Sequence, residues 1–304
     1  MLNIIGKRNW YFLFSLIIIV PGMISLFMWG LNLSIDFTGG SRMTLVFSDK
    51  ITQQTQNKVR AVFKEQKIEV VTIQPSTKSL IIRTKPIDEK QDARLLSAID
   101  KEVGLAKQES FETIGPVIGK EITVNALKAI GFASFLIVLY ISWSFRGVRK
   151  PASSWRFGIC AIAALLHDVL LVVGIFSLLG HFYGVEVDSL FVTAILTVIG
   201  FSVHDTIVVF DRIRENLRRT IDMPFGQVVN DSILQTLVRS LNTSLTTLLV
   251  LFTLLLFGGE TVRWFIFALF IGILSGTYSS IFNAAQLLVV WHEWSEKRKL
   301  SRRK

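Results

Sequence analysis

One apolar run of this 304-residue chain reads SLFVTAILTVIGFSVHDTIVVF, residues 189–210, and it carries a single acidic side chain, Asp205. A helix that crosses the hydrocarbon of a bilayer needs about 20 apolar residues. The run therefore predicts a membrane span with a carboxyl group about 9 Å from the end that Asp211 and Arg212 mark. An aspartate near the centre of a span costs about 2.5–3.5 kcal/mol, so such residues rarely lack a role.

The composition indicates a membrane protein along the whole chain. Hydrophobic residues make up 51% and charged residues 18%, and the mean hydropathy is +0.50, an excess that a water-soluble fold cannot easily bury. The single cysteine, Cys160, excludes a disulfide framework. Five more spans are predicted at residues 10–29, 122–145, 157–180, 240–258 and 264–291. The first could be a signal peptide, but it is too long and lacks a small-residue cleavage site, so we expect a retained anchor.

Lysine and arginine residues gather on one side of these six spans. Sixteen of them lie on the side of the termini, and the short loops of the other side carry only Arg263. This bias predicts that both termini are cytoplasmic. The same residues account for most of the net charge of +10, because they can contact anionic lipid headgroups, so the charge does not require a nucleic-acid partner. A contact between the tail and the ribosome is the alternative. The sixteen are Lys7, Arg8, Arg146, Arg149, Lys150, Arg156, Arg212, Arg214, Arg218, Arg219, Lys297, Arg298, Lys299, Arg302, Arg303 and Lys304.

The polar segment 31–120 predicts a small folded domain outside the cytoplasm, because its basic and acidic residues nearly balance. Alternation at residues 43–47 predicts a strand, and a helix follows at 52–67. Strands at 69–74 and 80–84 flank a turn at 75–77. A capping box of Asp88 and Gln91 begins a second helix, before a last strand at 109–114. The order βαββαβ predicts a ferredoxin-like sandwich.

The fold class expected is thus a polytopic helical membrane protein with a small α+β domain. The parts are an N-terminal tail and first span at 1–30, the external domain at 31–120, a bundle of five spans at 121–294, and a basic tail at 295–304. The external domain has no histidine, no cysteine and no carboxylate pair at a defensible spacing. We therefore expect this domain to act by contact with another molecule.

Glycines mark both joins between this domain and the spans. Gly39 and Gly40 follow Asp36, and Gly115 precedes Pro116, with Gly119 beyond. Ordinary turn chemistry explains them. The alternative is a hinge that lets the domain move.

A second intramembrane acid, Asp168, lies near the middle of the third span. Both acids predict a proton or ion pathway inside the bundle, and the alternative is that they only join helices through hydrogen bonds. Asp205 has a candidate partner in Arg239, at a comparable depth in the fifth span. Burial and a nearby guanidinium act on such a carboxyl in opposite directions, so one proton could decide whether the ion pair exists.

Polar and small residues line the last two spans. Ser240, Thr243, Ser244 and Thr247 form a stripe on the fifth span, and the sixth has a face of Gly272, Gly276, Ser279 or Ser280, and Asn283. The two glycines permit close helix packing. Asn283 with the threonines could instead hold water that leads to Asp205.

The dipeptides His167-Asp168 and His204-Asp205 do not predict a metal site. Neighbouring residues on a helix point about 100° apart, so each dipeptide offers one ligand to a shared ion. A proton relay through His204 is the more plausible role.

Three stretches resemble the SecD/SecF family of bacterial protein export, in the resistance-nodulation-division (RND) superfamily. They are Asp36-Phe37-Thr38-Gly39-Gly40, residues 200–216 (GFSVHDTIVVFDRIREN), and Gln235-Thr236-Leu237 with Arg239-Ser240 and Thr243-Ser244. The resemblance extends to length, span count and loop order. It implies a subunit that uses the proton motive force, with SecD, to drive or complete preprotein translocation on the periplasmic side. It also implies that protons are the coupling ion, that no cofactor is used, and that the protein performs no covalent chemistry and is not an enzyme.

The same resemblance implies an inner-membrane location, an essential Asp205 and a partner role for Arg239. His204 stands where many members carry Asn. The implied partners are SecD as a heterodimer, the SecYEG channel, YajC and YidC, the translocating preprotein and membrane lipid. Two rival functions remain from the residues: a proton-coupled efflux pump for small molecules or lipids, and a scaffold whose intramembrane acids are silent.

Overall fold

A computed structural model describes residues 2–75, 78–104, 106–146, 154–219 and 223–301. These residues form two compact units. Unit 1 comprises the described parts of Met1–Leu31, Ala129–Val185 and Leu190–Lys304, and unit 2 comprises Asn32–Lys128 and Glu186–Ser189. The predicted turn at 75–77 and the basic residues at 149–150 and 302–304 lie partly or wholly outside the described residues.

Among the described residues, six helical segments are long and apolar enough to cross a membrane, as the sequence predicted. Two 3-10 turns, Ile5–Lys7 and Glu260–Val262, precede the first and the last of them. The last span is a composite of α9 and α10 joined by a π-helical turn, Ser280–Ala284. The helices are α1 (Arg8–Trp29), α5 (Pro116–Ser144), α6 (Ser154–Tyr183), α7 (Ser189–Arg219), α8 (Phe225–Phe257), α9 (Arg263–Ser279) and α10 (Ala285–Ser301).

Two of these helices extend well beyond the predicted apolar runs. α7 continues to Arg219, past residue 210, and α8 begins at Phe225 rather than at residue 240. The early part of α8 is polar in sequence, yet it keeps a helical period of buried positions, at Val228, Val229, Ser232, Ile233 and Thr236. A hydropathy criterion finds only the stretch that lipid must solvate, so it misses such helical extensions.

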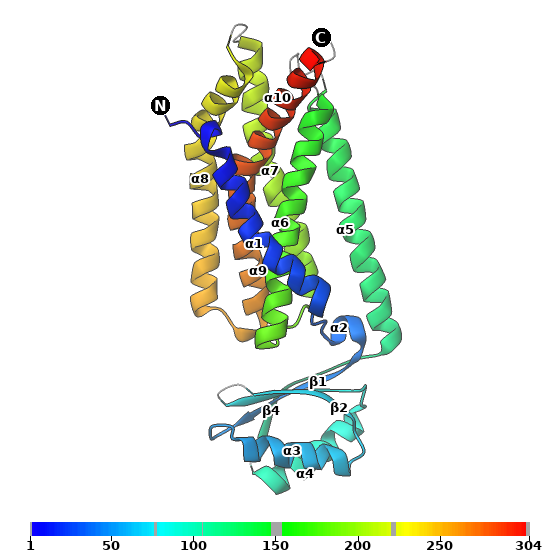
Figure 1. Ribbon diagram of the computed structural model, residues 1–304. Coiled ribbons are helices and arrows are strands. Elements are labelled where there is room, and N and C mark those ends of the chain that lie inside the picture. Colours follow the sequence, from blue (N-terminus) through cyan, green and yellow to red (C-terminus); the bar gives the residue numbers. More distant parts are fainter. Residues whose placement is uncertain (1, 76–77, 105, 147–153, 220–222, 302–304) are drawn as a thin grey trace. The chain divides into compact units, whose positions relative to one another are not determined.

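Three segments form the centre of unit 1. Half of the apolar window is buried in α6 and in α7, and 61% in the α9–α10 segment, compared with 17% in α1 and in α8 and none in α5. The first residues of α1 and the last of α10 lie at the same end of the bundle (Figure 1). The buried polar side chains of α6, α7 and α9 therefore lie at the centre of the bundle.

Close packing joins α1 to α6. A Cβ atom built on Gly22 would lie 2.8 Å from the Gly174 Cα atom, so the two backbones touch. One turn further, the Ser25 and Ser177 hydroxyls share a hydrogen bond of 2.7 Å. Small residues that let helix backbones approach, followed by a hydroxyl pair, are typical of helix contacts in membranes.

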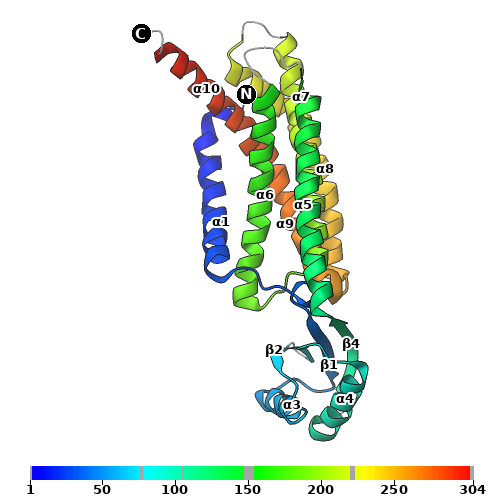
Figure 2. The ribbon, with the colours of Figure 1, turned by 90° about the vertical axis from the view of Figure 1, so that its right-hand side faces the viewer.

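Unit 2 contains a four-stranded antiparallel sheet, with α3 and α4 on one face (Figure 2). The order along the sheet is β2-β3-β1-β4. Alternate residues of β1 and β3, such as Met43, Leu45, Leu80 and Ile82, point into the core, where they meet Phe63 of α3. The elements are β1 (Gly40–Phe47), α3 (Gln53–Glu65), β2 (Val70–Pro75), β3 (Ser79–Thr84), α4 (Glu89–Val103) and β4 (Ala106–Ile114).

Local sequence signals set the bounds of these elements. The predicted capping box is present, because Asp88 accepts from the Gln91 backbone N–H at 2.7 Å and Gln91 accepts from that of Asp88 at 3.0 Å. β4 begins three residues earlier than predicted, since it pairs with β1 as far as Phe47 and Ala106. Unit 2 also includes residues 186–189, which the sequence placed in the bundle.

Candidate functional site

Both intramembrane aspartates face the interior of unit 1. Asp168 of α6 is 0% exposed and Asp205 of α7 is 2% exposed. Each lies within an apolar stretch of its helix, so the surrounding side chains must provide whatever compensates a charge there. The two carboxyl groups differ sharply in how well they are hydrogen-bonded.

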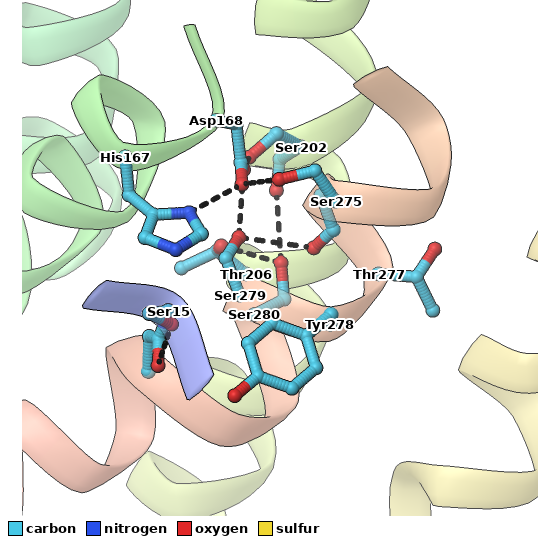
Figure 3. Close-up of polar contacts among 12 residues, drawn as sticks. Ser15, His167, Asp168, Ser202, Thr206, Ser275, Thr277, Tyr278, Ser279 and Ser280 are labelled. Carbon is cyan, nitrogen blue, oxygen red and sulfur yellow. Dashed lines mark hydrogen bonds and ion pairs between the residues drawn. The ribbon is translucent and has the colours of Figure 1, made fainter. Parts of the chain in front are cut away.

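Three serine hydroxyls surround the Asp168 carboxylate (Figure 3). Ser202 of α7 and Ser279 of α9 both donate to Oδ2 at 2.6 Å, and Ser275 of α9 donates to Oδ1 at 2.6 Å. The ring of His167 contacts Oδ1 through Nδ1 at 3.0 Å. We call Asp168 with Ser202, Ser275 and Ser279 the serine cage.

The serine cage joins three helices through one side chain. Each carboxylate oxygen has two partners, and hydrogen bonds to a charged acceptor are among the stronger ones in proteins. Further hydroxyl bonds lie beside it, because Thr206 of α7 bonds Ser280 at 2.8 Å, and Ser280 donates to the Ser202 carbonyl at 3.2 Å. This geometry favours the interpretation that Asp168 joins helices.

Asp205 is far less well satisfied. Its Oδ2 atom accepts from the Ser244 hydroxyl of α8 at 3.4 Å, near the limit of a hydrogen bond. Ser244 in turn accepts from Thr277 of α9 at 2.6 Å. Two hydroxyls thus lead from α9 to the carboxyl group.

Arg239 does not pair with Asp205 in this structure. The arginine lies five residues before Ser244 on α8 and its side chain is exposed. No ion pair between Arg239 and Asp205 occurs among the residues that the structure describes. The pairing stays a prediction, and it requires a change in the arginine side chain or in the contact between α7 and α8. His204 is likewise exposed beside Asp205, and its relay role stays a prediction.

The predicted polar stripe on α8 is only partly directed inward. Ser240 is 2% exposed and its hydroxyl has no partner within the described part of the chain. Thr243 is exposed and Thr247 is half-buried, and both donate to carbonyls of their own helix. Asn283 donates to Ser15 of α1 at 2.9 Å, which directs it toward α1.

The glycines of α9 lie where the sequence suggested close packing. A Cβ atom on Gly276 would lie 3.1 Å from that of Ser202 and 3.6 Å from Asp168 Oδ2, and one on Gly272 would overlap Val198. The two glycines therefore let α9 approach α7 closely enough for Ser275 and Ser279 to reach Asp168.

The Asp-Phe-Thr-Gly-Gly motif lies in unit 2, where it forms the short helix α2 (Ile35–Thr38) and the start of β1. Gly39 has φ of 71° and Gly40 of 130°, values that favour glycine. A Cβ atom on Gly39 would lie 2.9 Å from the Pro116 Cα atom, and Pro116 is the first residue of α5, after Gly115. These contacts favour a tight turn, and the hinge stays a prediction.

Sequence reasoning missed several of the polar partners. Ser202 and Ser275 gave no separate signal, although Ser275 and Ser279 are four residues apart and so share a helix face. Arg83 and Glu186, which pair in unit 2 at 2.9 Å, are far apart in the sequence and carry no motif. Within the described residues, no group of three or more His, Cys, Asp or Glu residues is arranged to hold a metal ion.

Comparison with known proteins gives consistent matches over the chain. The family described as "Protein export membrane protein SecD/SecF, C-terminal" matches residues 95–294, and the "SecD/SecF GG Motif" matches residues 24–51. A protein translocase subunit SecF from Thermobaculum terrenum is 47% identical, over 96% of this chain and 94% of that protein. A protein translocase subunit SecDF from Bacillus subtilis is 36% identical, over 94% of this chain and 37% of that protein.

A solved structure has the same fold. The crystal structure of SecDF, described as a translocon-associated membrane protein from Thermus thermophilus, superposes with a TM-score of 0.84 at 35% identity. The match covers 96% of this chain and 39% of the SecDF chain.

Proposed function

Because the chain belongs to the SecD/SecF family of protein export membrane proteins, we propose that it couples proton entry to preprotein translocation as one subunit of a Sec translocase. The observation that carries the proposal is the contrast between the two buried aspartates. Asp168 accepts three hydrogen bonds from serine hydroxyls, each 2.6 Å long, whereas Asp205 accepts one hydrogen bond, from Ser244, of 3.4 Å. Protonation should change the packing most at the carboxyl group that has the fewest hydrogen-bond donors.

Asp205 is the coupling residue in this proposal. A buried carboxylate without donors or a cation is costly, and a proton removes that cost. When the proton leaves, the carboxylate attracts Arg239, one and a half turns from Ser244 on the same helix. The contact between α7 and α8 then differs between the two protonation states, and no covalent chemistry or cofactor is needed. A charge that crosses a potential of 100 mV gains about 2.3 kcal/mol, similar to typical coupling energies.

The orientation follows from the basic residues. Both termini lie in the cytoplasm of a bacterial cell, the spans lie in the inner membrane, and unit 2, with its ferredoxin-like βαββαβ order, lies in the periplasm. The basic end of the bundle contacts anionic lipid headgroups.

SecD is the principal partner. The relatives named SecDF are about three times as long as the matched region, and this chain matches 37% and 35% of them. Here a separate SecD subunit supplies the part of SecDF that this chain lacks. The exposed His204, next to Asp205, faces that subunit. The SecYEG channel, YajC, YidC and the moving preprotein complete the expected assembly.

The test uses inverted membrane vesicles that contain this chain with SecD and the channel. Asp205→Asn keeps the size of the side chain but removes its titration, so we expect the proton-dependent part of preprotein export to fall about tenfold or more. Asp211→Asn is the matched control, because Asp211 lies on the same helix but is exposed and pairs with Arg214. Unchanged proton-dependent export in Asp205→Asn would contradict the proposal.

A further inference from the structure

Most of the connection between α6 and α7 is part of unit 2, although α6 and the rest of α7 after Ser189 belong to unit 1. Residues 186–189 are the segment that belongs to unit 2, and α7 begins at the last of them, Ser189. Unit 2 holds the segment by side-chain and backbone contacts that come from two separate places, residues 32–38 at the start of the Asp-Phe-Thr-Gly-Gly motif and the end of β3.

The first contact is an ion pair. Arg83 of β3 donates to Glu186 at 2.9 Å through Nη1, and its Nη2 donates to the Thr38 hydroxyl of the motif at 3.1 Å. Both charged side chains are largely buried, with 8% and 12% exposed. One guanidinium therefore connects the sheet, the motif and the α6–α7 connection. A buried ion pair is strongly dependent on geometry, because removal of either partner leaves an uncompensated charge.

The second contact caps a membrane helix. Asp36 Oδ2 accepts from the backbone N–H of Ser189 at 2.8 Å. The first N–H groups of a helix have no partner within the helix, and a negative charge at that end is favourable. Asp36 thus supplies from the motif the cap that α7 needs.

Backbone hydrogen bonds complete the grip. Ser34 donates to the Val187 carbonyl at 2.8 Å, and Val187 donates to that of Asn32 at 2.8 Å, which makes a short parallel bridge. The motif is itself held in place by local contacts. The Asp36 backbone N–H and the Thr38 hydroxyl donate to Ser34, and the Gly119 backbone packs against Gly39, since a Cβ atom on Gly119 would lie 2.9 Å from the Gly39 nitrogen. A displaced motif would therefore carry residues 186–189 with it.

We propose that residues 32–38 together with Arg83 clamp the start of α7, so that a displacement of unit 2 is delivered to the helix that carries Asp205. Asp205 lies sixteen residues beyond Ser189 in one continuous helix, about 24 Å along its axis. The clamp rests on the proposed function, since it assigns a route between the external domain and the coupling carboxyl group. It gives the acidic residue and the threonine of the motif specific tasks.

The test reverses the Arg83–Glu186 pair in the full chain with SecD, in the same vesicles. We expect Arg83→Glu and Glu186→Arg each to lower proton-dependent export about tenfold, and the double reversal to restore most of it. The matched control reverses the exposed pair of Lys85 and Glu69 in the same unit, and it should leave export unchanged. Hydrogen exchange in β3 reports whether unit 2 stays folded.

Two results would overturn the clamp. Single reversals that export normally would mean that the pair carries no coupling. Lost export with rapid exchange in β3, or without rescue in the double reversal, would assign the pair to the folding of unit 2. Asp205→Asn in the same assay separates this inference from the proposed function: if that variant loses proton-dependent export and the reversals do not, the clamp alone is wrong.

Discussion

Removal of the Asp168 carboxylate should weaken the bundle, whereas removal of the Asp205 carboxylate should not. Asp168→Ala deletes the acceptor of three hydroxyl bonds of 2.6 Å. Hydrogen bonds between membrane helices contribute about 0.6–1.7 kcal/mol each, so the three together contribute about 2–5 kcal/mol. Asp205→Ala removes one bond of 3.4 Å and a poorly compensated carboxyl group, so we expect a change in the free energy of unfolding within about 1 kcal/mol. Both variants delete the same carboxyl group.

The assay is reversible unfolding of the purified chain in detergent micelles, followed by tryptophan fluorescence. It reports unit 1, because all seven tryptophans lie there. A further variant gives an internal check: Ser275→Ala should cost about 1 kcal/mol alone and nothing in the Asp168→Ala background, where its acceptor is already gone. The different roles assigned to the two carboxyl groups would be refuted by equal losses of unfolding free energy in Asp168→Ala and Asp205→Ala. They would also be refuted if Ser275→Ala cost the same free energy with and without the Asp168 carboxyl group.

Three further predictions concern helix packing, a buried acid and a tight turn. Gly174→Val places side-chain atoms against the Gly22 backbone and should cost about 1–3 kcal/mol in the same titration, whereas Gly131→Val, at an open position, should cost far less. Burial raises the pKa of Asp92, and the hydrogen bond from the Gln108 amide offsets part of this rise. At a pH between the ordinary aspartate pKa and the raised one, the folded state therefore keeps a proton that the unfolded chain has lost. The stability of unit 2 should then fall as the pH rises from the ordinary aspartate pKa through the raised one, and Asp92→Asn should abolish that fall when urea unfolding is followed by hydrogen exchange. Gly39→Ala and Gly104→Ala both strain a positive φ, but only the first meets backbone, at Pro116, so exchange in β1 should accelerate more in Gly39→Ala; equal effects would contradict the tight turn.

Spans and small-domain elements could be predicted because they depend on local patterns. Apolar length identifies a helix that lipid must solvate, and the alternation of Met43, Leu45 and Phe47 identifies a strand with one buried face. The box of Asp88 and Gln91 closes within a single turn, so neighbouring residues alone determine it. The start of α8 lacked such a signal, since its first turns are polar.

The polar contacts of the bundle could not be predicted, because they depend on how each helix is rotated about its axis. Asp205 and Arg239 were expected to meet from depth alone, but α8 presents Ser244 to the carboxyl group and directs Arg239 outward. Three helices meet at Asp168, and the glycines of α9 fix how closely they approach. Rotation and approach are properties of the packed bundle.

The π-helical turn at Ser280–Ala284 changes the phase of the last span. In an uninterrupted α-helix, residues 275, 279 and 283 would follow one face, yet the two serines face Asp168 on α6 and Asn283 faces Ser15 on α1. One extra residue in a turn redirects everything after it by about 100°. Deletion of a single residue there would rotate α10 about the axis of the span. This rotation would separate Glu293 from Arg8 of α1, with which it forms an ion pair at 2.8 Å. The length of this segment is thus fixed to the residue.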